Sequence, residues 1–208
     1  NTLVVAASGD SGVTLVSGTS SEGSIAFADG TSGADAYRGW INYNHGTNFM
    51  RFFTNATEAM RIHHTGAVTK SLQPAFQAFP TSAQTDIAIN TAVTIVLGTE
   101  GFDVGANFAS NTFTAPVTGK YQLNVVLSAG QLDIDATFYQ LQLVTSNKSY
   151  DQTLDPLFSS DTAYWSWSFS VLADMDEDDT AVIKLYQAAG AAQADIGTGT
   201  TFSGYLVA

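Results

Sequence analysis

The chain has 208 residues, which is enough for one ordinary domain and a smaller appendage. Hydrophobic residues make up 45% of it and charged residues only 12%, so the composition predicts a folded protein with a weakly charged surface. Lys and Arg number 7 against 19 Asp and Glu, which gives a net charge of −12. This balance argues against partners such as nucleic acid and anionic lipid, because both require basic groups.

Cysteine is absent, which excludes a disulfide framework and a thiolate metal site. No apolar run approaches the ~20 residues that span a bilayer, so we expect no membrane insertion. No secretory signal is visible. Because the first residue is Asn1 rather than Met, we interpret the chain as a fragment whose missing N-terminal part contacts other proteins of its assembly.

Residues 1–70 alternate short apolar runs with turn residues, a pattern that predicts β-structure. Each predicted strand offers only two or three apolar side chains, too few to close a core within one chain. We therefore expect a homotrimer in which three chains share a core about one axis. The expected strands are Val13–Val16, Ser24–Phe27, Gly39–Tyr43, Phe49–Phe53 and Met60–His63.

Residues 23–68 resemble the strand repeat of bacteriophage tail fibres and tailspikes. The resemblance implies a β-structured, Gly-rich fibre shaft over residues 1–70 and a location on the virion, as part of an extracellular tail fibre. Its other tail proteins would then be partners of the missing N-terminal part. The matching residues are Ile25, Phe27, Asp29-Gly30, Tyr37-Arg38-Gly39, Ile41, Tyr43, His45, Met50, Phe52, Met60-Arg61-Ile62 and Gly66.

From Pro74 onward, apolar and polar residues alternate with a period of two, which predicts antiparallel strands packed as a sandwich. The clearest alternation runs through Trp165, Trp167 and Phe169, whose side chains we expect on the inner face of a sheet. Similar patterns occur at 121–127, 139–143, 181–185 and 202–207.

Residues 74–208 resemble a complement-1q/tumour-necrosis-factor-like jelly roll. The resemblance implies an all-β, antiparallel jelly-roll sandwich that forms homotrimers and binds partners rather than transforming them. Where such domains have a Gly-Asp pair before the penultimate strand, this chain has Asp178-Asp179, so the geometry of that turn is open. The matching motifs are Pro74-Ala-Phe-Gln-Ala78, Asn107, Phe113-Thr-Ala-Pro116, Gly119-x-Tyr121 and Phe202-Ser-Gly-Tyr-Leu206.

Enzyme motifs are missing, including nucleophile elbows, phosphate loops and zinc-binding His patterns. We therefore predict that the chain is not an enzyme, although two carboxylates of a glycan depolymerase would leave no motif. The pair His63-His64 closes a predicted strand. One of the two could reach a metal on a threefold axis, but we favour a polar strand end beside the Thr65-Gly66 turn.

Two groups of acidic residues are candidates for a Ca²⁺ site, the one cofactor that the jelly-roll resemblance implies. Asp174, Asp176 and Asp178 belong to the densest charge cluster of the chain, and Asp133 and Asp135 form the second group. The first cluster lacks the Gly and Glu positions of an EF-hand loop. A solvated loop is therefore the alternative to a metal site.

Receptor contacts are expected on loops, where recognition residues usually lie on a rigid scaffold. We expect them in segments 99–111, 128–136 and 145–162. The hypothesis is that the chain is the distal tip of a tail fibre that recognises a bacterial surface glycan or an outer-membrane protein. The alternative is a purely structural fibre or trimerisation cap. The candidate contact residues are Asn147, Tyr150, Asp151, Phe158 and Tyr164.

Overall fold

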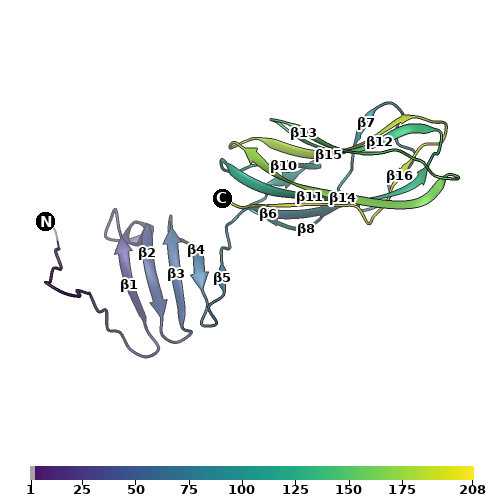
Figure 1. The fold of residues 1–208 in the computed structure, drawn as a ribbon. Helices are drawn as coiled ribbons and strands as arrows, with labels where there is room; N and C mark the ends of the chain where they lie inside the picture. Colours follow the sequence, from purple (N-terminus) through teal and green to yellow (C-terminus); the bar gives the residue numbers. More distant parts are fainter. Residues whose placement is uncertain (1–2) are drawn as a thin grey trace. The chain divides into compact units, whose positions relative to one another are not determined.

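The computed structural model describes residues 3–208, which form an all-β chain with antiparallel pairing (Figure 1). The chain divides into two compact units that join between Leu72 and Gln73. One short 3-10 helix, η1 (Gly33–Tyr37), interrupts the β-structure of the first unit. Within residues 3–208, no helix has the length and apolar character needed to cross a membrane.

The first unit is a single antiparallel sheet of five strands in the order β1-β2-β3-β4-β5. Four of the strands expected from the sequence are confirmed, but the one expected at Val13–Val16 is wrong. These residues pair with no neighbouring strand, and Val16 is 90% exposed, so the alternation there has no sheet to join. The strands are β1 (Glu22–Phe27), β2 (Gly39–Asn44), β3 (Phe49–Thr54), β4 (Thr57–Ile62) and β5 (Val68–Thr69).

The second unit is a sandwich of two six-stranded sheets that lie face to face (Figure 1). The first sheet consists of β13 (Ser149–Leu154), β12 (Ala136–Thr145), β15 (Thr180–Ala189), β10 (Thr112–Thr114) and β9 (Phe108–Ala109), with β7 (Ala92–Thr94) paired to β15. The second consists of β14 (Thr162–Met175), β11 (Gly119–Leu132), β17 (Thr201–Leu206), β6 (Ala75–Phe79) and β8 (Thr99–Val104), with β16 (Asp195–Ile196) paired to β11.

Three expected loops are therefore shorter than the sequence suggested. Strand β8 occupies the first half of segment 99–111, and β13 lies within segment 145–162. The end of β11 fills the first part of segment 128–136. Polar alternation such as Ser149-Tyr-Asp-Gln-Thr-Leu154 reads as a loop, yet it suits an edge strand with one solvated face.

The core of the sandwich comes from the inward-facing residues of both sheets. On β11, the side chains of Tyr121, Leu123, Val125 and Leu127 are buried, whereas the residues that alternate with them face outward. The ring of Phe76 stacks on that of Phe113 with centroids 4.6 Å apart and meets Phe202 edge-on at 4.9 Å. Each such side chain contributes about 1.5–3 kcal/mol when it leaves water.

The row of aromatic residues on β14 lies on the inner face of its sheet, as expected. Phe169 pairs with Val125 and Trp167 with Leu127, and both aromatic side chains pack against the core. Because β14 is an edge strand, the row is only half-buried, and Trp165 is 39% exposed.

In the acidic turn between β14 and β15, Asp178 stands where the jelly-roll resemblance places a Gly. Asp178 stands at φ 71°, in the left-handed region that favours glycine. The turn is held by hydrogen bonds from Asp178 N to Ala115 O (2.8 Å) and from Asp179 N to Asp176 O (3.0 Å). The chain thus tolerates a strained residue at this turn.

We predict that Asp178→Gly stabilises the second unit by about 0.5–1 kcal/mol, because glycine adopts the left-handed conformation without steric cost. The matched control is Asp176→Gly, which removes the same charge from the same turn at a position without positive φ. Thermal unfolding would measure both variants. Equal melting temperatures for the two variants would contradict the prediction.

A buried carboxylate fixes the link that follows β11. Asp133 is 3% exposed, and its oxygens accept backbone N–H groups from Asp135 (2.8 Å), Ala191 (2.5 Å) and Ala192 (2.8 Å). Its own N–H donates to the hydroxyl of Tyr139 at 2.7 Å, and burial raises the pKa of Tyr139 to about 12. These bonds connect the β11–β12 link to the segment that follows β15.

The pKa of Asp133 is lowered, chiefly by the hydrogen bond from Asp135 and then by those from Ala192 and Ala191. Because the pKa is lower in the folded state, the ionised carboxylate stabilises the fold at pH values above 3.8, the ordinary pKa of an Asp side chain. This stabilisation is lost as the pH falls through the lowered pKa. At neutral pH, we expect Asp133→Asn to destabilise the unit by about 1–3 kcal/mol, because an amide donor then faces backbone donors.

The measurement is the melting temperature of wild type and variant from neutral to strongly acidic pH. The difference between them should shrink below the ordinary carboxyl pKa. The exposed Asp155 serves as the control residue, since its side chain has no hydrogen bond in the structure. A pH-independent difference for Asp133→Asn, or the same loss for Asp155→Asn, would show that charge at Asp133 is unimportant.

Candidate functional site

The second unit has two ends, which the long strand β11 separates by roughly 40 Å, given the rise per residue of a strand. Near the start of β11, Lys120 N donates to Ala208 O at 2.7 Å, and Gln73 Nε2 donates to Leu206 O at 2.6 Å. The first and the last residues of the unit therefore lie at this end, which we call the base end. The distal end, beyond Leu132, holds segments 133–135, 155–161 and 190–200.

The sequence-predicted contact residues divide between these ends. Asn147, Tyr150, Asp174 and Asp176 line a groove of about 350 Å³ at the base end, and Asp151 is exposed on β13 nearby. Tyr150 and Asp151 thus belong to a strand rather than to the expected loop.

Most of the polar groups in the base groove already bond to one another. The side-chain amide of Asn147 donates to Asp174 O at 3.2 Å and to Asp179 Oδ2 at 2.6 Å. The ammonium of Lys148 lies 4.9 Å from the ring centroid of Tyr150, a cation–π contact. Lys120 and Asp174 form an ion pair. The polar and charged side chains of the groove therefore already have partners within the chain.

The two acidic groups proposed for Ca²⁺ lie at opposite ends of the unit, because Asp174 pairs with Lys120 at the start of β11 whereas Asp133 and Asp135 follow its end. Residues 3–208 contain no group of three or more His, Asp or Glu side chains arranged to hold a metal ion. Ca²⁺ requires 6–8 oxygen ligands. Both oxygens of Asp133 already accept backbone N–H groups, and Asp178 occupies the strained apex of its turn. The described residues of one chain therefore do not fit Ca²⁺.

The two histidines follow the end of β4 at Ile62. His63 Nε2 lies 3.0 Å from Thr69 Oγ1, and its ring meets that of Phe49 at 5.2 Å. His64 follows β4 and is exposed.

The predicted aromatic residues of the distal end have different environments. Phe158 packs against the core with its ring 5.2 Å from that of Trp165, so its side chain serves packing. Tyr164 is 88% exposed, because β14 directs Trp165 inward and Tyr164 outward. Tyr164 lies on a strand, not in the expected loop.

A groove of about 490 Å³ lies beside Tyr164 at the distal end. Besides Tyr164, its polar side chains are those of Ser128 and Gln131 on β11 and of Asp195 and Thr198 in the segment that begins with β16. Gly130, Gly197 and Gly199 contribute backbone without side chains to the lining. The groove therefore combines an exposed aromatic ring, hydrogen-bonding groups and accessible main chain.

Hydrogen bonds hold two polar side chains of this distal groove, those of Gln131 and Asp195. Gln131 Nε2 donates to Asp195 Oδ2 at 2.8 Å, and Asp86 N donates to Asp195 Oδ1 at 2.9 Å. Gln131 stands at φ 52°, a left-handed conformation that is costly for a non-glycine residue and concentrates at functional sites. The free lone pairs of Asp195 and the hydroxyls of Thr198 and Tyr164 suit a neutral ligand rich in hydroxyl groups.

The sequence indicated part of this groove. Tyr164 was among the predicted residues, and Gln131 falls in the expected contact segment 128–136. Asp195 and Thr198 were missed, because they approach Tyr164 only through the pairing of β16 with β11. The Gly-rich run Asp195-Ile-Gly-Thr-Gly199 was the available signal, since glycines mark close approach of main chain.

Comparison with known proteins gives a family and a set of similar structures. The model of the C1q domain matches residues 75–207. The globular domain of zebrafish complement 1qA is 17% identical and covers 65% of this chain and 98% of its own, with a TM-score of 0.49. The crystal structure of murine APRIL at pH 8.0 shows 11% sequence identity and a TM-score of 0.46. It covers 65% of this chain and 99% of the APRIL chain. A comparison with curated proteins gives no match.

Domains of the C1q and tumour-necrosis-factor type typically trimerise. The matched residues 75–207 run from β6 to the end of β17 and include both ends of the sandwich. This chain belongs to the C1q domain family.

Proposed function

We propose that this chain is the receptor-recognising tip of a phage tail fibre and that its distal groove binds a glycan on the host surface. The observation that carries the proposal is the groove beside Tyr164, the most exposed aromatic side chain of the second unit. An exposed tyrosine ring offers an apolar platform with a polar tip, on which the flat face of a sugar can stack. The fibre-like residues 23–68 support the virion location.

The chemistry of the distal groove favours a neutral glycan over a charged ligand. Asp195 is the one ionisable carboxylate among the described residues that line it, and no Lys or Arg belongs to the lining. A strongly acidic polysaccharide would lack a cationic partner there, on a chain whose net charge is −12. Glycan cleavage is not favoured at this groove, because hydrolysis ordinarily needs a pair of carboxyl groups.

The position of the groove also supports recognition. It lies at the end opposite Gln73, through which the second unit connects to residues 1–72. In a trimer, three identical grooves would bind a repetitive surface together, so weak individual contacts would give strong attachment.

The first test is Tyr164→Ala in the full chain, measured by binding to host cells and by competition with phage adsorption. Removing the stacking platform should weaken binding about tenfold or more, the size expected for a central aromatic contact. Leu157→Ala is the matched control, because Leu157 is 86% exposed in the neighbouring distal segment and does not line the groove. Equal binding by both variants would refute the groove as the receptor site.

A structural cap is the second candidate, favoured by the typical trimerisation of C1q-type domains. Removal of residues 73–208 distinguishes the two functions. A cap predicts fibres that fail to assemble, whereas a receptor-binding tip predicts particles that assemble and fail to adsorb.

A further inference from the structure

One face of the β1–β5 sheet is apolar, and no second sheet within residues 3–72 covers it. The strand register places nine apolar side chains on this side, and none of them is buried. Phe27 is 62% exposed and Ile25 50%. A sheet with an open apolar side is not expected to be stable alone in water. This apolar face consists of Ile25, Phe27, Ile41, Tyr43, Met50, Phe52, Met60, Ile62 and Val68.

The opposite face of the same sheet is paired within the chain. Arg51 Nη2 donates to Glu22 Oε1 at 2.5 Å, and Arg61 Nε donates to Glu58 Oε1 at 2.8 Å. The side-chain hydrogen bond from Asn44 and the charge of Arg51 are among the causes that lower the pKa of Glu22. The rings of Trp40 and Phe53 stack at 3.8 Å. All these charged groups point away from the apolar face, so covering the apolar face would desolvate none of them.

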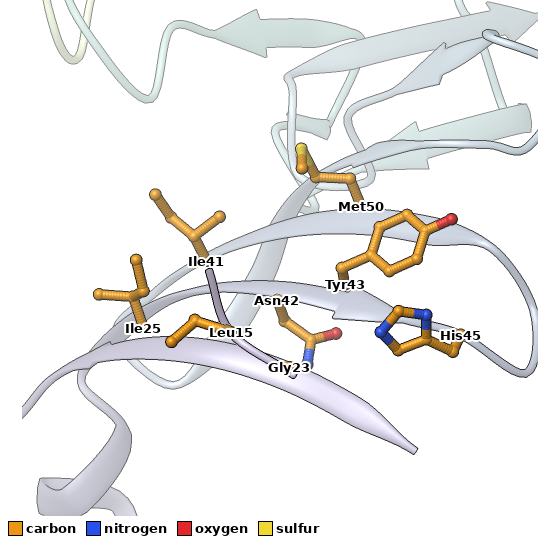
Figure 2. A pocket seen from close by; sticks show the side chains of 8 residues that line it. All are labelled: Leu15, Gly23, Ile25, Ile41, Asn42, Tyr43, His45 and Met50. Atoms are coloured by element: carbon orange, nitrogen blue, oxygen red, sulfur yellow. The ribbon is translucent and has the colours of Figure 1, made fainter. Parts of the chain in front are cut away.

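The apolar face is hollowed where another side chain could enter. Ile25, Ile41 and Met50 project from neighbouring strands around a groove of about 310 Å³, and Leu15 crosses beside Gly23 (Figure 2). Leu15 is itself 50% exposed, so the segment before β1 covers the groove only in part.

We propose that this apolar face packs against the same face of two further copies of the chain, forming a three-chain core for residues 22–69. The sheet continues directly into the C1q domain, whose family typically trimerises. Trimerisation there holds three copies of the sheet close together at high effective concentration. The interface is between identical chains and does not depend on what the distal groove binds.

The test uses single cysteines, which are selective because the natural chain has none. Ile25→Cys places a thiol on the apolar face, and Ala26→Cys, its matched control, places one on the opposite face of the same strand. The full-length variants are treated with a short bifunctional maleimide and separated under denaturing conditions. The expected result is inter-chain cross-linking for Ile25→Cys and little for Ala26→Cys.

Equal cross-linking of the two variants would overturn the proposal, because it would reflect tethering by the C1q domain alone. Cross-linking to a different protein instead of to a second copy would do the same.

A second variant tests the interface without introducing a cysteine. Ile41→Asp places a charge at the centre of the apolar face, on the residue paired with both Ile25 and Phe52. Hydrogen exchange in residues 22–69 should become faster at least tenfold, while protection in residues 75–207 stays unchanged. Unchanged protection in both regions would contradict a buried interface at Ile41.

Discussion

The contact between the inner faces of the two six-stranded sheets is the interaction on which the second unit depends. Phe76 comes from the first strand of that unit, Phe113 from the middle of the chain and Phe202 from its last strand, and the three rings meet in one cluster. Because the cluster joins residues far apart in sequence, it forms only when the last strand, β17, has paired with β6 and β11. Burial of these rings therefore fixes the topology as well as the stability.

The two units differ in how far they bury the apolar side chains of their strands. Strands β11 and β12 each direct alternate side chains into an interior that the opposite sheet covers. The β1–β5 sheet has the same alternation, with apolar residues on one side and networks around Arg51 and Arg61 on the other, but it has no second layer. The described residues of one chain pair the charged groups on one side of that sheet and leave most of its apolar side exposed.

Period-two alternation predicted the strands that a neighbouring strand stabilises, and it misled where no neighbour exists. Tyr121 to Leu127 and Trp165 to Phe169 fall on the inner faces as expected, whereas Val13–Val16 has the same local pattern and forms no strand. The predicted contact residues were recognisable by type but not by position. Tyr150 and Tyr164 lie at opposite ends of the sandwich, because strand direction, which composition does not report, separates them.

The hydrogen bond between Gln73 and Leu206 brings the entry point of the C1q domain beside its last strand. A module whose two chain ends adjoin can be inserted into a surface loop of an unrelated scaffold, or relinked with new termini, without stretching its backbone. The same adjacency leaves the Tyr164 side of the module free of any covalent attachment. Residues 73–208 can thus be joined to different proteins through one end of the domain. The residues around Tyr164 at the other end can then vary in sequence without affecting that connection.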